Sequence, residues 1–175
     1  MKKVTVCLFS LAVVWGFFLT SSYGSHDITR WRDNRTAAVS LAFDDNWPTQ
    51  IDIGVPLLNE RNLKGTFFLV TDFMYSAGAY LTWEQWREVA DQGHEIGSHS
   101  VTHPNMAELS EQEVREELEQ SREMVNWNIP SQSCLSFAYP YGRFNDQVIQ
   151  ITSEYYLVGA RGLSTFEGGY LNHYY

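Results

Sequence analysis

The sequence has little cysteine, no excess of basic charge and no internal repeat. Of its two cysteines, Cys7 lies within the first 24 residues, so loss of that segment leaves Cys134 alone and excludes an intrachain disulfide. Acidic residues outnumber basic ones by 21 to 12, which gives a net charge of −9. This charge opposes binding to nucleic acid and to anionic membrane surfaces. We therefore predict no nucleic-acid partner, whereas a neutral or cationic polymer is compatible with the charge.

The chain also lacks a linker or low-complexity run after residue 36. Its 175 residues are enough for one domain with a real hydrophobic core. The hydrophobic content of 44% and the charged content of 19% are typical of a globular protein. We expect one domain over residues 37–175, truncated at its C-terminal end, with residues 25–36 as an N-terminal tail.

The first 24 residues have the pattern of a signal peptide. Lys2 and Lys3 precede an apolar stretch, Val4–Leu19, and Ser22–Gly24 forms a small-x-small cleavage pattern. An uncleaved membrane anchor is the rival interpretation, but the stretch is shorter than the roughly 20 residues that span a bilayer. We expect cleavage, membrane contact only through this segment, and a secreted or periplasmic (cell-envelope) protein.

Short apolar runs alternate with helix signals along the rest of the chain. The runs cover residues 38–43, 66–70, 94–98, 134–139 and 156–160. Helix starts are predicted at Pro48, at the capping boxes Thr82/Gln85 and Ser110/Glu113, and at Asn145. This order predicts an α/β fold whose parallel sheet is either open or curled into a barrel. A barrel of seven or eight strands needs more residues, so we expect it to be incomplete at the C-terminus.

Other features of these elements have structural interpretations. The charges of the acidic helix after Ser110 are interpreted as a solvated face. Cys134 is expected to be a buried thiol in a strand. His26 is interpreted as a tail residue, His94 as a strand-start residue, and Glu95 as structural.

Polar residues follow four of the five predicted strands. Asp44 and Asp45 follow the first, His99 and His103 the third, Tyr141 the fourth, and Arg161 the fifth. Binding sites of α/β barrels and open sheets lie at the C-terminal ends of their strands. We therefore expect these side chains to converge.

The acids and histidines together predict a divalent metal site. An Asp-Asp pair alone is commonly a turn or helix cap, and a lone His-x-x-x-His is a weak signal. His99 and His103 are four residues apart, so both can face one metal if their segment forms a helical turn. Two imidazoles and one carboxylate leave room for water and substrate, as catalytic zinc sites do. Zinc is favoured, although Co(II) and Fe(II) suit the same ligands.

Three motifs resemble those of a known family. They are Phe43-Asp44-Asp45, the segment HSVTH at 99–103, and FAYPYG at 137–142, which alone is equally an ordinary turn. In this order they resemble the polysaccharide deacetylase family, the NodB-like domain of carbohydrate esterases, over about residues 36–165. The resemblance implies a distorted (β/α) barrel of the NodB-like type. It also implies a metal-dependent hydrolase that removes acetyl groups from a polysaccharide.

The resemblance also implies roles for individual residues. Asp44 would be the general base, and Asp45 would bind the metal with His99 and His103. The backbone N–H of Tyr141 would help to form an oxyanion hole. The physical chemistry agrees, because a bound divalent ion activates water and a nearby carboxylate can accept its proton.

The chain departs from the family pattern at three places. Asn46 and Trp47 replace the usual Gly-Pro, and Trp47 is either a sugar-stacking platform or helix-start packing. Ala138 stands where the family often has an arginine that orients the base; Arg161 is a candidate substitute or a plain surface residue. The catalytic acid is usually the histidine of a late Leu-x-His motif. We interpret the match ending at His173 as coincidental, so a catalytic acid, if the protein has one, is expected beyond Tyr175.

The sequence therefore favours a metal-dependent enzyme that removes N-acetyl groups from peptidoglycan, chitin oligomers or poly-N-acetylglucosamine. Two alternatives stay open. One is a non-catalytic sugar- or metal-binding domain without the catalytic acid, and the other is an O-acetyl esterase acting on xylan.

Overall fold

The structure is a computed structural model that describes residue 34 and residues 36–75 and 81–160. The chain divides into two units, Met1–Ala38 and Val39–Tyr175, and the second contains the elements discussed below. Arg161, His173, the predicted signal peptide and most of the predicted tail, including His26, lie outside the described residues.

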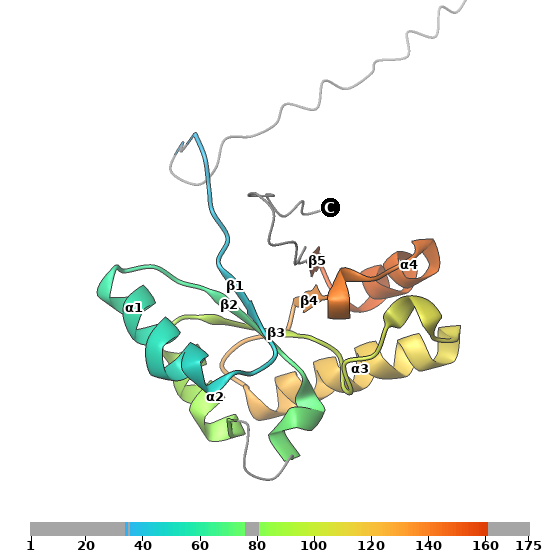
Figure 1. The fold of residues 1–175 in the computed structure, drawn as a ribbon, viewed down its shortest axis with the longest axis horizontal. Coiled ribbons are helices and arrows are strands. Elements are labelled where there is room, and N and C mark those ends of the chain that lie inside the picture. The colour runs from blue at the N-terminus through green and yellow to red at the C-terminus, as the bar shows by residue number, and fades with distance from the viewer. Residues whose placement is uncertain (1–33, 35, 76–80, 161–175) are drawn as a thin grey trace, which may run out of the picture. The chain divides into compact units, whose positions relative to one another are not determined.

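Five parallel strands pair in chain order to form a curled half-barrel (Figure 1). They are β1 (Ala42–Asp44), β2 (Thr66–Leu69), β3 (Glu95–Ser98), β4 (Ser136–Ala138) and β5 (Val158–Ala160). The predicted parallel α/β fold is confirmed, and each predicted run overlaps one strand. The first strand begins later than expected because backbone pairing with β2 starts only where the Thr66 N–H donates to the Leu41 carbonyl.

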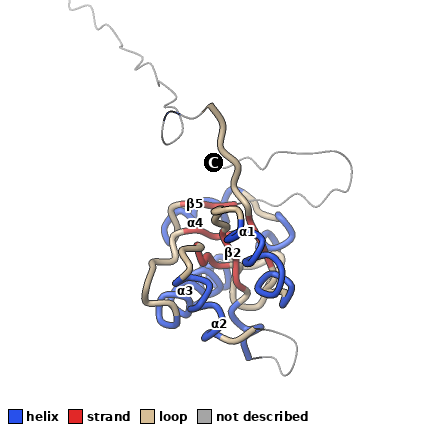
Figure 2. Tube along the Cα trace, turned by 90° about the vertical axis from the view of Figure 1, so that its left-hand side faces the viewer, coloured by secondary structure: helices blue, strands red, loops and turns tan. Residues whose placement is uncertain are grey.

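Helices connect the strands and lie around them (Figure 2). The longer ones are α1 (Val55–Glu60), α2 (Trp83–Asp91), α3 (Glu111–Asn128) and α4 (Asp146–Tyr155). Short helical segments are η2 (Gln50–Gly54), η3 (Thr71–Tyr75), η4 (Met106–Glu108) and η5 (Pro140–Gly142). No helix in the described part of the chain has the length and apolar character needed to cross a bilayer.

The predicted helix starts are confirmed. Helical backbone begins at Pro48 and passes through the π-helical η2 into α1. Both predicted capping boxes form, at Thr82 before α2 and at Ser110 before α3. The Asn145 side chain accepts a hydrogen bond from the Val148 N–H at 2.9 Å and so caps α4. Each cap satisfies backbone N–H groups that a helix start otherwise leaves unpaired.

The sheet has two apolar faces of unequal size. Side chains alternate along a strand, so Phe67, Ile96 and Phe137 lie on the face that packs against the helices in the main core. Phe68, Ala138 and Ala160 form a smaller cluster on the opposite, inner face. The ring of Phe43 stacks on that of Phe67 with centroids 4.8 Å apart, which places the next residue, Asp44, on the inner face.

Candidate metal centre

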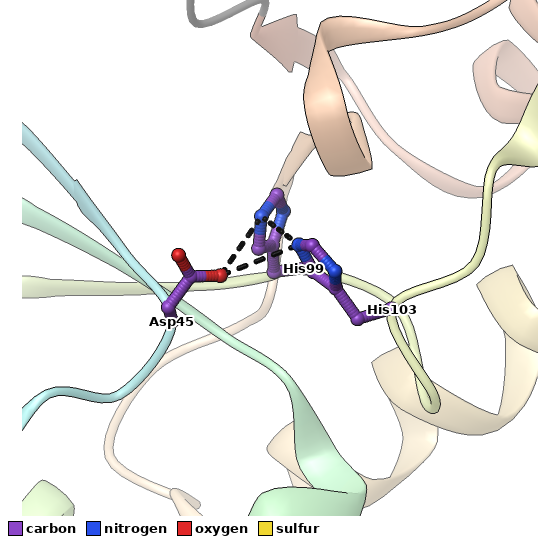
Figure 3. Close-up of side chains that lie close together, drawn as sticks. All are labelled: Asp45, His99 and His103. Carbon is purple, nitrogen blue, oxygen red and sulfur yellow. Dashed lines mark hydrogen bonds and ion pairs between the residues drawn. The ribbon is translucent and has the colours of Figure 1, made fainter. Parts of the chain in front are cut away.

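Three side chains from two loops meet at the C-terminal edge of the sheet (Figure 3). Asp45 directly follows β1, whereas His99 and His103 follow β3. The Asp45 Oδ1 atom lies 3.6 Å from the His99 Nε2 atom and 3.3 Å from the His103 Nε2 atom. The two Nε2 atoms are 3.1 Å apart. The predicted convergence of these three residues is therefore present, and each offers one ligand atom to a common point.

The histidine segment reaches this geometry without a helix. Ser100 and His103 have φ angles of 71° and 62°, which no right-handed helical turn allows. The His103 N–H donates to the Ser100 hydroxyl at 2.9 Å, which closes a tight loop. The helical turn that was the expected condition for a shared metal is absent, and a loop with left-handed residues brings the two rings together instead.

The tautomer of His99 is set by the neighbouring strand. His99 is only 3% exposed, and its Nδ1 atom lies 2.7 Å from the carbonyl oxygen of Ala138. A carbonyl only accepts hydrogen bonds, so Nδ1 carries the hydrogen and the lone pair of Nε2 is directed toward Asp45. Histidines that bind metals commonly have such a partner on the other ring nitrogen.

Lowered pKa values favour the neutral form of both imidazoles. Burial lowers the pKa of His99, although the hydrogen bond to Ala138 and the charge of Asp45 oppose this effect. Burial and the proximity of His99 lower the pKa of His103, against the opposing charges of Asp45 and Asp44. Metal binding requires neutral imidazole, so the residues present fit a divalent ion such as zinc.

Asp44 lies beside this cluster and has an unusual carboxyl group. Its Oδ1 atom is buried and has no hydrogen-bond partner among the described residues. Burial and the charge of Asp45 raise the pKa of Asp44 to about 6, while the charge of His103 opposes the shift. Six other described residues also have a buried polar atom without a partner, so Asp44 is distinguished by its place beside the cluster and by its raised pKa.

Tyr141 also reaches the site from η5, after β4. Its ring packs edge-on against that of His103, with centroids 4.5 Å apart, and the side chain is 66% exposed. Trp47, in the loop after Asp45, is 55% exposed, and its two interpretations stay open. The proposed contribution of Arg161 stays a prediction, because that residue lies outside the described part of the chain.

Left-handed backbone is concentrated around this site. Of the seven described non-glycine residues with positive φ, five belong to it: Asp45, Asn46, Ser100, His103 and Tyr141. Side chains with a Cβ atom disfavour this region, and only Asn and Asp visit it routinely. Such strain persists where the surrounding structure over-determines it, and it clusters at functional sites.

Two residues that support the site were not predicted from the sequence. Asn46 is fully buried and bonds to the backbone of Val70. Glu117 on α3 accepts hydrogen bonds from Val101 and Thr102, so the interpretation of all α3 charges as a solvated face was wrong. The departure from the family's Gly-Pro could have pointed to Asn46 as a supporting residue. Nothing in the helical periodicity distinguishes Glu117 from the other acids of α3.

Three other residues have the structural roles expected of them, except that Cys134 lies two residues before β4 and not in a strand. The Glu95 carboxylate accepts hydrogen bonds from the hydroxyls of Thr66 and Ser136, each at 2.7 Å, and so links β2, β3 and β4. His94 precedes β3 and accepts from the Gly65 N–H at 3.2 Å. Cys134 is a buried free thiol.

Known proteins resemble both the sequence and the fold. A peptidoglycan-N-acetylglucosamine deacetylase from Listeria monocytogenes is 29% identical over 151 residues, covering 85% of this chain and 31% of the relative. The structure of a Streptococcus pyogenes deacetylase in complex with acetate is 27% identical, with a TM-score of 0.65 over 69% of this chain and 53% of that one. A CE4-family pseudoenzyme from Bacillus anthracis is 28% identical, with a TM-score of 0.58 over 66% of this chain and 39% of that one.

The chain spans about half or less of the length of these relatives. The sequence profile of the polysaccharide deacetylase family matches residues 32–159, which is most of the chain and includes the three motifs. The curled parallel sheet agrees with that family's distorted barrel. The chain belongs to the polysaccharide deacetylase family.

Proposed function

We propose that this protein is a metal-dependent hydrolase that removes N-acetyl groups from an amino-sugar polymer. The observation that carries the proposal is the cluster of Asp45, His99 and His103, whose ligand atoms lie within 4.8 Å of one another. A site of one carboxylate and two neutral imidazoles keeps coordination positions free, as catalysis requires. Zinc is the favoured ion, with Co(II) or Fe(II) as alternatives.

The surrounding residues have complementary roles in this proposal. When bound, the divalent ion would lower the pKa of water and polarise the acetyl carbonyl. Asp44 takes the proton of the attacking water, because its carboxyl adjoins the cluster. The water oxygen bonds to the acetyl carbon, the carbon–nitrogen bond breaks, and the leaving sugar amine takes up a proton as acetate is released. The Tyr141 N–H donates to the developing oxyanion. Arg161, which lies outside the described residues, is the candidate to orient Asp44.

The choice of substrate is supported by relatives. The Listeria relative is named a peptidoglycan-N-acetylglucosamine deacetylase, which favours an N-acetylated cell-wall or related polymer over an O-acetylated one. We also propose export of the chain through residues 1–24, which would bring it to such polymers. The net charge of −9 suits neutral or cationic glycans.

A second candidate is a non-catalytic domain that binds metal or sugar. Two observations favour it: Ala138 replaces the arginine expected by resemblance, and one structural relative is described as a pseudoenzyme. A mutant of that pseudoenzyme is described as having restored enzymatic activity, so loss of activity in this family is compatible with a preserved fold.

Acetate release separates these candidates. The full chain is incubated with N-acetylglucosamine oligomers and, in parallel, with acetylated xylan, each with added zinc or cobalt. Deacetylase function predicts acetate from the oligomers, and loss of nearly all of it in Asp44→Ala. Exposed Asp52→Ala is the control that keeps activity. Metal binding without acetate release from either substrate would support the non-catalytic candidate, and release from xylan alone would support the esterase.

A further inference from the structure

We propose that Asn46 is a positioning residue of the metal centre, and that its side-chain amide holds the Asp44–Asp45 turn against the end of β2. The inference rests on the proposed metal site but assigns a role to a residue outside the ligand set. The Asn46 side chain makes two hydrogen bonds with one backbone residue. Its Oδ1 atom accepts from the Val70 N–H at 2.9 Å, and its Nδ2 donates to the Val70 carbonyl at 3.0 Å.

The register of the sheet explains why Val70 is the partner. Ala42 pairs with Thr66 and Asp44 with Phe68, so the next step of the same register brings position 46 opposite Val70. The backbone has already left the strand there, because Asp45 and Asn46 have φ angles of 74° and 57°. The Asn46 amide therefore bonds Val70 in place of the backbone groups that a longer β1 would supply.

The two hydrogen bonds between Asn46 and Val70 hold the backbone next to Asp45. Asn46 and Val70 are both fully buried, so loss of either hydrogen bond leaves a buried polar group without that partner, which is costly. The bonds fix the backbone directly after Asp45, whose carboxylate Oδ1 lies 3.3 Å from the His103 Nε2 atom. A glycine at position 46 would adopt the backbone conformation. It would leave the Val70 N–H without its Asn46 acceptor, and the Val70 carbonyl would keep only the Phe73 N–H, at 3.2 Å.

The decisive variant is Asn46→Gly, because it removes the amide without adding backbone strain. Asn62→Gly is the matched control, since Asn62 is also left-handed, with φ of 52°, but is exposed and far from the site in sequence. Co(II) is titrated into the full chain and followed by its visible absorption. We expect Asn46→Gly to bind Co(II) about tenfold or more weakly than wild type, as for other residues that orient ligands. We expect Asn62→Gly to match wild type.

Unfolding and amide exchange separate positioning from simple loss of stability. All titrations are run where circular dichroism shows each variant to be folded, and exchange of the Val70 N–H is expected to be faster in Asn46→Gly. Unchanged Co(II) affinity and spectrum in folded Asn46→Gly would overturn the positioning role. Absence of Co(II) binding by wild type would instead overturn the metal site itself, and with it this inference.

A different observation assigns Glu117 a parallel role for the histidine loop. Its Oε2 atom accepts from the Val101 N–H at 2.7 Å and the Thr102 N–H at 3.0 Å, and its Oε1 atom accepts from the Thr102 hydroxyl at 2.6 Å. These donors lie in the loop between His99 and His103. One carboxylate from α3 thus fixes three donors of the loop that carries both imidazoles.

The neighbouring acid of α3 provides the control. Glu116 is exposed and bonds to Gln112 of its own helix, so Glu116→Ala preserves the loop. We expect Glu117→Ala to weaken Co(II) binding about tenfold and to speed amide exchange at Val101 and Thr102. Glu117→Gln keeps one acceptor oxygen and should be intermediate in both measurements. Equal Co(II) affinity in folded Glu117→Ala and Glu116→Ala would contradict the assignment.

Discussion

The carbonyl oxygen of Ala138, at the end of β4, accepts the Nδ1 hydrogen of His99, which follows β3, at 2.7 Å. The contact uses the backbone of residue 138, so it does not depend on the side chain at the position where the family often has arginine. The orientation of the candidate ligand His99 therefore does not depend on the residue that orients the candidate base Asp44. The absence of an arginine at 138 affects the expected environment of Asp44, but it leaves the direction of the His99 lone pair unchanged.

Loss of one ligand should abolish tight metal binding. Asp45→Asn preserves the shape and the tolerance for left-handed backbone but removes the anionic oxygen, and His99→Gln removes an imidazole. We expect each to weaken Co(II) affinity about 100-fold or more. Titration followed by visible absorption measures this loss. Asp52→Asn, an exposed acid in η2, should bind as wild type does; equal weakening in it would mean that the effect is not local.

Metal removal should lower the thermal stability of the chain. An ion that binds only the folded state stabilises it by about 2.7 kcal/mol at a free concentration 100 times its Kd. We therefore expect zinc to raise Tm in calorimetry and a chelator to reverse the rise. Asp45→Asn should show the same Tm with zinc and with chelator. A zinc-dependent rise that persists in this variant would point to another binding site.

The stability of the metal-free chain should fall as pH rises through the range in which Asp44 titrates. The pKa of Asp44 is raised from 3.8 to about 6 by burial and by Asp45, so the folded state retains a proton that the unfolded state has released. The resulting contribution is present below pH 3.8 and is lost by about pH 6. A shift of this size corresponds to about 3 kcal/mol.

Urea unfolding at several pH values measures this dependence. Asp44→Asn removes the titrating group, so its free energy of unfolding should decline less than that of wild type between pH 4 and about 6. Zinc should also reduce the decline, because a nearby cation favours the carboxylate and lowers its pKa. Parallel curves for wild type and Asp44→Asn would show that Asp44 is not the group responsible.

Gly97 should tolerate no side chain. A Cβ atom there would lie 2.6 Å from the Phe68 ring and 2.6 Å from the Ser136 hydroxyl, on the crowded inner face. We expect Gly97→Ala to reduce the free energy of unfolding by about 1–3 kcal/mol through overpacking. Gly54→Ala is the control, since a Cβ atom there meets nothing closer than 3.9 Å. Equal stability of the two variants in urea would contradict the packing argument.

Local sequence signals were sufficient for the elements and for the types of the candidate metal ligands. Alternating apolar runs and capping residues act within a few positions, so the helix starts at Thr82, Ser110 and Asn145 followed from the sequence. The candidate ligand types followed from residue chemistry, because carboxylates and imidazoles placed after parallel strands meet at one edge of the sheet. The choice of Asp45 as the carboxylate ligand followed from the family resemblance. The roles of Asp44, Tyr141 and Arg161 in catalysis stay predictions.

Tertiary structure decided how those ligands are held. Two of the supports join residues 15 or more positions apart: the bonds between Asn46 and Val70, and the bond that Thr102 donates to Glu117. The third, the left-handed histidine loop, depends on backbone strain that the rest of the fold supports. Local propensity contains no information on such contacts, because their free energy is gained only when separate strands and helices have packed. The sequence alone therefore determined which atoms can bind a metal, and the packing of β2, β4 and α3 around them determined where those atoms lie.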